Sequence, residues 1–279
     1  MKGKVAIEAL QQMKRDGRKI VGVMVYDYQM ARIVDRTGVD IVSVGDSVGV
    51  HVWAQQSEMD VTLDQMLLVC AAVRRGVERA LVSCDFPYGP MQQGPDAALA
   101  AARRLVSEGG ADMIKLDAAA EHPESVTALT RAGIPVWAQF GITPHTAAQY
   151  GGMAKAGPER SAQFTDRFVA EARLLEEAGA ALLDFTNSGP VAGPAATQAV
   201  RIPVIGGLGG GPWLDGRIRS ALAATGALAA SLDDTTTARY ANVAQTTLDA
   251  IAAYADDVRA ARQIRGGIPV PPPDGRAHG

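Results

Sequence analysis

Aspartates stand at the ends of the short apolar runs that the sequence predicts as β-strands. The runs are rich in small or branched apolar residues and are bounded by turn-forming residues. Five aspartates end such a run or follow it closely: Asp27, Asp46, Asp85, Asp117 and Asp184. If the strands are parallel neighbours in one barrel, their carboxyl ends meet and these carboxylates crowd one mouth. Their mutual repulsion becomes tolerable when a cation lies among them.

A hard divalent cation suits such a mouth. No Cys/His spacing in the chain supports zinc, whereas oxygen ligands with bound waters suit Mg²⁺, which commonly takes one or two protein carboxylates. The alternative is that each aspartate only caps the helix that follows its strand. Asp40 and Asp112 open their strands instead, so we expect them at the opposite face, as caps or solvated charges.

Lys115 precedes Asp117 by two residues in "IKLD". Residues two apart on a strand point to the same side, so we expect both side chains to lean into the mouth. A lysine there either balances the charge of the carboxylates or stabilises a developing enolate. We favour the role of Lys115 in stabilising an enolate, and keep charge balance through a salt bridge as the alternative.

Three other features carry weaker signals. The glycine run 206–211 lacks the context of a phosphate loop or dinucleotide fingerprint, and predicts only close backbone approach to a ligand. His145 is the one histidine near a strand end, and we interpret it as structural. Ser47 has no histidine partner that would make it a nucleophile, so we expect it to bind the ion or a substrate carboxylate.

The elements that position these residues alternate between strands and helices. Helix-ending glycines lead at once into strands, which is typical of the short αβ turns of a barrel. The pattern therefore predicts an α/β fold, a (β/α)8 TIM barrel, in preference to an open doubly wound sheet. Eight strands are predicted, the last from a weak signal: 19–27, 40–46, 79–85, 111–117, 134–140, 180–185, 202–207 and 226–232.

The chain is expected to form one barrel domain over residues 1–265, with an N-terminal helix, a C-terminal helical extension and a Pro/Gly-rich tail at 266–279. The net charge of −3, without a basic cluster, indicates no nucleic-acid partner and no membrane surface. No apolar stretch is long enough to span a bilayer and the N-terminus is amphipathic, so we expect a cytoplasmic protein. Cys70 and Cys84 are expected to be reduced structural thiols.

Longer segments resemble the ketopantoate hydroxymethyltransferase family, within the phosphoenolpyruvate mutase and isocitrate lyase superfamily. They occur in family order and cover roughly two thirds of the chain. The matching segments are "YDYQMARIVDRTGVDIVSVGDSVG", "VTLDQM", "AAVRRG", "LVSCDFPYG", "EGGADMIKLD", "GIPVWAQFGITPH", "EEAGAALLDF", "IPVIGGLGGGPWLDG" and "YADDVR".

The resemblance implies a Mg²⁺-dependent homo-oligomeric enzyme that adds a one-carbon unit to a small 2-oxo acid, with 5,10-methylenetetrahydrofolate as the one-carbon donor. By position, Asp46 and Asp85 would hold the metal and Asp117 would lie in its outer shell. Ser47 would bind the oxo-acid carboxylate, and Lys115 would support the oxo group or the enolate. Tyr26 and Gln139 complete the expected substrate-binding residues.

The chain departs from the family at the expected base. The family glutamate after the sixth strand is replaced by Asp184, and displacement of a base by about 1 Å can cost ~100-fold in rate. A family histidine is replaced by Gln139, and a His-Cys pair by Trp213-Leu214. We therefore expect a divergent paralogue that keeps the enolising step, with Asp184 as base, and adds either a folate-borne carbon or an aldehyde, as an aldolase does.

Two other readings stay open. A C–C or P–C lyase of the isocitrate lyase or phosphoenolpyruvate mutase type would use the same metal site, but the Lys-Cys-Gly-His type of loop is absent. A non-catalytic barrel would explain the lost glutamate and histidine. The presence of Asp46, Asp85 and Lys115 argues against that second reading.

Overall fold

The computed structural model describes residues 3–234 and 236–267. By contacts, the chain divides into two compact units, Met1–Ala221 and Leu222–Gly279. The predicted tail at 266–279 lies almost wholly outside the described residues, and the predicted domain boundary at residue 265 stays a prediction.

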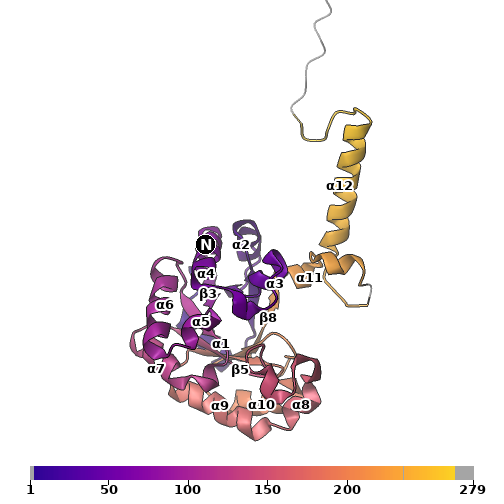
Figure 1. The fold of residues 1–279 in the computed structure, drawn as a ribbon. Coiled ribbons are helices and arrows are strands. Elements are labelled where there is room, and N and C mark those ends of the chain that lie inside the picture. Colours follow the sequence, from indigo (N-terminus) through magenta and orange to yellow (C-terminus); the bar gives the residue numbers. More distant parts are fainter. Residues whose placement is uncertain (1–2, 235, 268–279) are drawn as a thin grey trace, which may run out of the picture. The chain divides into compact units, whose positions relative to one another are not determined.

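The first unit is a closed barrel of parallel strands in chain order, surrounded by helices (Figure 1). This confirms the predicted (β/α)8 class. The strands are β1 (Ile20–Val25), β2 (Ile41–Val44), β3 (Leu81–Asp85), β4 (Met113–Leu116), β5 (Val136–Gly141), β6 (Leu182–Thr186), β7 (Val204–Gly206) and β8 (Gly216–Ser220).

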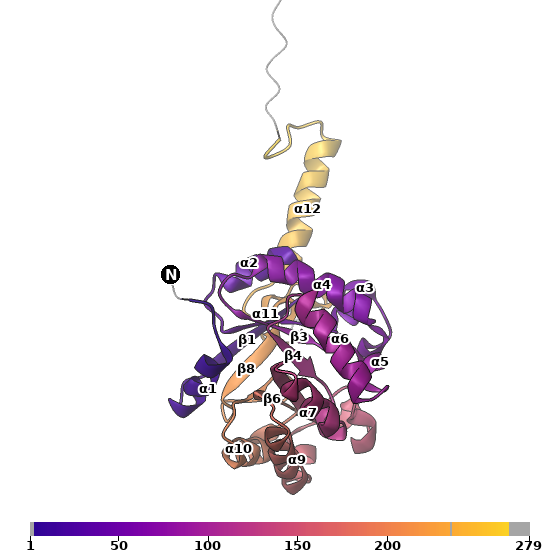
Figure 2. The ribbon, with the colours of Figure 1, turned by 90° about the vertical axis from the view of Figure 1, so that its left-hand side faces the viewer.

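The helices follow the strands as the sequence pattern predicts, and most lie outside the barrel (Figures 1 and 2). The α-helices of the first unit are α1 (Ile7–Arg15), α2 (Tyr28–Asp35), α3 (Val48–Trp53), α4 (Leu63–Gly76), α5 (Tyr88–Met91), α6 (Pro95–Ser107), α7 (Pro123–Arg131), α8 (Pro158–Ala162), α9 (Thr165–Glu177) and α10 (Gly189–Ala199); α11 (Ala221–Thr225) spans the boundary between the units. Short 3-10 helices are η1 (Glu58–Asp60), η2 (Ala119–Glu121), η3 (Ala147–Tyr150) and η4 (Met153–Lys155).

An apolar layer, here called the floor, fills the barrel at the amino-terminal ends of its strands. Inward-facing strand residues form it, and α1 adds Leu10 and Met13, so the predicted N-terminal helix packs against this end. Fully burying one such aliphatic side chain contributes roughly 2 kcal/mol. The strand residues of the floor are Ile20, Ile41, Leu81, Met113, Trp137, Leu182, Ile205 and Ile218.

The predicted eighth strand at 226–232 is wrong. That segment contains the 3-10 helix η5 (Ala229–Leu232), and β8 lies ten residues earlier, pairing with β1 and β7. The β8 sequence GRIRS alternates between exposed arginines and buried Ile218. No continuous apolar run marks this strand in the sequence, because one of its faces is open to solvent.

The second unit contains η5 and α12 (Val243–Arg259). The Asn242 side chain caps α12 by accepting a hydrogen bond from the Gln245 N–H, and no residue of this helix is buried. The predicted C-terminal helical extension is therefore present. Among the described residues, no helix is both long and apolar enough to cross a membrane.

Candidate active site

The polar side chains of the mouth lie on the same inward-facing sides of the strands as the floor residues. On β6, Leu182 lies in the floor, and Asp184 and Thr186 follow it at steps of two. On β4 the same step leads from Met113 to Lys115. Because side chains alternate between the two faces of a strand, each floor residue determines which residue reaches the mouth.

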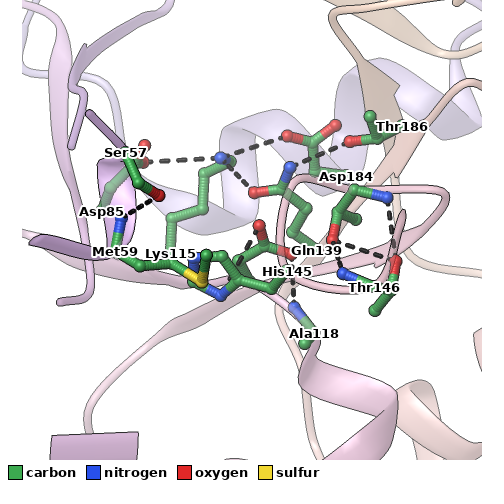
Figure 3. A network of polar contacts seen from close by, with 12 residues as sticks. Ser57, Met59, Asp85, Lys115, Ala118, Gln139, His145, Thr146, Asp184 and Thr186 are labelled. Carbon is green, nitrogen blue, oxygen red and sulfur yellow. Dashed lines mark hydrogen bonds and ion pairs between the residues drawn. The ribbon is translucent and has the colours of Figure 1, made fainter. Parts of the chain in front are cut away.

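Lys115 lies between two buried carboxylates (Figure 3). Its Nζ is 3.5 Å from Asp85 Oδ1 on β3 and 3.3 Å from Asp184 Oδ2 on β6. All three residues are at most 4 % exposed. The structure thus brings together the predicted base, the predicted enolate-supporting lysine and one predicted metal ligand.

Gln139 holds the lysine in place. Its Oε1 accepts a hydrogen bond from Lys115 Nζ at 2.5 Å, and its Nε2 donates to Thr186 Oγ1 at 2.9 Å. Both ends of the amide are therefore engaged, which fixes its orientation.

Thr186 was not predicted as a site residue. Its position two residues after Asp184 was the available signal, because the step of two keeps both side chains on one face. Gly141 makes room opposite: it has φ +93°, and a Cβ there would lie 2.5 Å from the Thr186 carbonyl oxygen. A side chain at 141 would force β5 and β6 apart at the mouth.

Burial shifts the pKa values of the central groups. It raises the pKa of Asp184 to about 6, with Lys115 acting in the opposite direction. For Lys115, burial acts to lower the pKa, but the surrounding carboxylates, led by Asp85, raise it above its ordinary value. The lysine is therefore charged, whereas Asp184 titrates close to neutrality, where a general base is most effective.

Asp46 and Asp85 form the carboxylate-rich side of the mouth. Burial raises the pKa of both groups, and the Asp85 charge raises that of Asp46 further. Asp85 Oδ1 is buried without a hydrogen-bond partner among the described residues. Lys115 Nζ lies 3.5 Å from this oxygen, which is longer than an ordinary hydrogen bond, so the oxygen fits a divalent cation as a closer partner.

No group of three or more His, Cys, Asp or Glu side chains within the described ranges is arranged to hold a metal ion. Two protein carboxylates are enough for Mg²⁺, which fills its remaining positions with water and substrate oxygens. Asp117 is engaged elsewhere: it accepts a hydrogen bond from the Ala118 N–H, and its Oδ2 lies 3.7 Å from His145 Nδ1.

Tyr26 and Ser47 meet at the ends of β1 and β2. Their hydroxyl oxygens are 2.9 Å apart, and Ser47 Oγ lies 3.2 Å from Met24 Sδ. Burial raises the pKa of Tyr26, so its phenol is a neutral hydrogen-bond donor. These two predicted substrate-binding residues therefore form one hydroxyl pair next to Asp46.

Asp27 is the one strand-end aspartate that lies outside the mouth. It is exposed and caps α2 by accepting a hydrogen bond from the Met30 N–H at 2.8 Å, which is the alternative role considered for each of these residues. Asp40 and Asp112 accept hydrogen bonds from Val21 and Val82 at the starts of neighbouring strands, as expected for the opposite face.

The glycine run has a packing role. A Cβ at Gly211 would meet the Trp213 ring at 2.3 Å, and one at Gly209, where φ is +61°, would meet Asn187 at 2.6 Å. Trp213 in turn donates to Ser188 Oγ at 3.0 Å. The close backbone approach predicted for a ligand is therefore made, at these two glycines, by the chain's own side chains.

The fold and this mouth define a barrel enzyme class with buried acid–lysine chemistry at the carboxyl ends of its strands. Solved structures share the fold: 2,3-dimethylmalate lyase, a phosphoenolpyruvate mutase/isocitrate lyase superfamily member, superposes with a TM-score of 0.59 at 16% identity, over 92% of this chain and 88% of that one. Phosphonopyruvate hydrolase in complex with oxalate and Mg²⁺ gives 0.58 at 14% identity, with the same coverage.

The chain belongs to the ketopantoate hydroxymethyltransferase family, whose model matches residues 4–263. A 3-methyl-2-oxobutanoate hydroxymethyltransferase from Cyanothece sp. is 38% identical over 259 residues, which cover 91% of this chain and 96% of that relative. One of the same name from Salinibacter ruber is 36% identical over 257 residues, covering 92% and 95%. These findings confirm the family resemblance of the sequence segments.

Proposed function

We propose that this protein removes a proton from C3 of a 2-oxo acid and joins the resulting enolate to a carbon electrophile, with Mg²⁺ as cofactor. The observation that carries the proposal is the placement of Lys115 Nζ between Asp85, Asp184 and Gln139. A fixed cation beside a buried base can stabilise the charge that develops on the substrate oxygen.

Asp184 acts as the base. Its Oδ2 faces Lys115, while its Oδ1 is buried without a hydrogen-bond partner among the described residues and is free to accept the C3 proton. Its pKa of about 6 leaves it ionised at neutral pH yet basic enough to take up a proton. The family glutamate is longer, so the shorter Asp184 favours an oxo acid seated closer to β6.

The carboxylates of Asp46 and Asp85 would hold the metal, since they supply the hard oxygen donors that Mg²⁺ prefers. When bound there, Mg²⁺ supplies Lewis-acid stabilisation of the substrate's oxo oxygen. Ser47 and Tyr26 donate hydrogen bonds to the substrate carboxylate from the neighbouring strand ends. Asp117 remains as an outer residue that orients His145.

Hydroxymethyl transfer is the C–C bond-forming step that the relatives' names support. The one-carbon unit would come from 5,10-methylenetetrahydrofolate, or an aldehyde would take its place. A cytoplasmic homo-oligomer, as expected from the sequence, belongs to the same proposal.

Proton exchange tests the enolising step before any electrophile is known. The protein is incubated in D2O with Mg²⁺ and 2-oxo acids from pyruvate to bulky aryl examples, and loss of the C3 proton signal is followed by NMR. We expect metal-dependent exchange, which Asp184→Asn lowers by about 10³-fold, within the range general bases contribute.

Asp27→Asn is the matched control, because it changes another strand-end aspartate that only caps a helix, and asparagine caps equally well. Its exchange rate should equal that of the wild type. Absence of exchange for every acid would exclude the proposal. Release of a smaller oxo acid from 2-methylisocitrate-like substrates would instead identify a lyase.

A further inference from the structure

His145 carries a buried polar atom that the proposed chemistry does not use. Its side chain is 6 % exposed, and its Nε2 has no hydrogen-bond partner among the described residues. A buried polar atom without a partner loses its hydrogen bond to water, so native structures rarely keep one without a reason. From the sequence, His145 is expected to be structural, but packing alone leaves this atom unexplained.

The surroundings of the ring determine what Nε2 can bind. Nδ1 faces Asp117 Oδ2 at 3.7 Å, and the Tyr88 ring packs against the imidazole edge-on at 5.0 Å. In the neutral ring, a carboxylate, which only accepts hydrogen bonds, favours the tautomer with the proton on Nδ1. Nε2 is then an acceptor, and its ligand must be a donor.

His145 also lies on the correct side of the barrel to meet a substrate. Tyr88, Asp117 and His145 follow the neighbouring strands β3, β4 and β5, so all three lie at the carboxyl ends. Figure 3 draws His145 in the same view as Lys115 and Gln139, without a dashed contact to either. A 2-oxo acid with an aliphatic or aryl chain offers only acceptor oxygens once ionised, so it does not satisfy Nε2.

We propose that His145 binds the electrophile, by accepting a hydrogen bond at Nε2 from an O–H or N–H group on that second substrate. This inference rests on the proposed function, because it assigns the second partner of the same site. Two sources supply such a donor: a hydroxyaldehyde through its hydroxyl group, and a reduced folate through its N–H groups. An aldehyde without a donor lacks the contact.

Nitrogen-15 NMR of the imidazole tests the contact without any need for turnover. The chain has four histidines, so a His145→Phe variant assigns the His145 signals by their loss. Glycolaldehyde, 5,10-methylenetetrahydrofolate and acetaldehyde are added separately to Mg²⁺-loaded protein. We expect the Nε2 resonance to move with glycolaldehyde, with the folate or with both, and not with acetaldehyde. A shift with only one of the two donor ligands identifies the source of the donor.

Kinetics of His145→Phe provide the second measurement. Phenylalanine keeps an aromatic ring against Tyr88 while it removes both nitrogens. We expect kcat/KM for the donor-bearing electrophile to fall at least tenfold, mainly through KM, while C3 exchange changes less than threefold. His122→Phe is the matched control, since His122 is partly exposed at the start of α7, and it should alter neither quantity.

The possible failures are distinct. No Nε2 shift with either donor ligand, or equal losses of exchange and coupling in His145→Phe, overturns the role of His145 and leaves the exchange result of the wild type standing. An Nε2 shift in a protein that exchanges no oxo acid supports the His145 contact and excludes the enolising function.

Discussion

The floor and the mouth of this barrel are built from the same strands but by opposite energetics. In the floor, Leu182 and its neighbours are buried and apolar, which stabilises the fold. Two residues further along β6, Asp184 is equally buried, but burial opposes its charge and raises its pKa. The floor therefore contributes stability, whereas the buried charges of the mouth cost free energy of folding, which fits their role in the proposed chemistry.

The largest effect should follow removal of the cation that balances the mouth. Lys115→Met leaves Asp85 and Asp184 buried without it, which costs about 3–5 kcal/mol when one partner of a buried pair is removed. Urea denaturation of metal-free protein at pH 8 should show this loss, and C3 exchange should fall by ~10³-fold. Lys155→Met, at an exposed lysine, is the control; equal stability of the two variants would refute the charge-balancing role.

A substitution in the floor should change the free energy of unfolding through lost packing alone. Leu182→Ala creates a cavity at a fully buried position and should lower the free energy of unfolding by about 2–5 kcal/mol. The loss should be the same at pH 5 and pH 8 and with or without Mg²⁺, because no charge is involved. A pH-dependent loss would mean that the floor and the mouth are not separable.

Asp184→Asn should change the free energy of unfolding in the opposite direction and stabilise the protein. The folded-state pKa of about 6 exceeds the ordinary unfolded value near 3.9, so the folded state binds the proton more tightly. Protonation therefore favours folding below about pH 4, and this contribution is lost as the pH rises through 6. In metal-free protein we expect the variant to be roughly 1–3 kcal/mol more stable than the wild type at pH 8, and nearly equal at pH 4.

Calorimetry over that pH range would measure the difference, with Asp27→Asn as the control. A variant less stable than the wild type at pH 8 would show that the attraction between Asp184 and Lys115 outweighs the burial cost.

The smallest effect should come from the residue that holds Gln139. Thr186→Val keeps the shape of the side chain but removes the acceptor for Gln139 Nε2, which loosens the hold on Lys115. A neutral hydrogen bond contributes about 0.5–1.5 kcal/mol, so exchange should slow about 3- to 10-fold. Thr186→Ser should retain most of the activity, and an equal loss in both variants would point to the threonine methyl group instead.

Much of the site could be predicted from the sequence because the sequence shows where most of the strands end. Parallel strands deliver their carboxyl ends to one face, so the positions of Asp46, Asp85, Lys115 and Asp184 at or near strand ends already placed them together. The same rule failed for Asp27, because a carboxylate just past a strand can turn outward and cap the next helix. β8 could not be predicted from an apolar run, because a half-exposed strand carries charged residues.

The barrel class, seven of the eight strands and the residue types at the mouth could be predicted from the sequence, because local periodicity and turn residues encode them. Three features emerge only in the folded chain: Gln139 joins Lys115 to Thr186, Trp213 donates to Ser188, and His145 Nε2 finds no hydrogen-bond partner among the described residues. These are contacts between residues far apart in the chain, and their geometry depends on barrel closure and strand register, which no local pattern specifies.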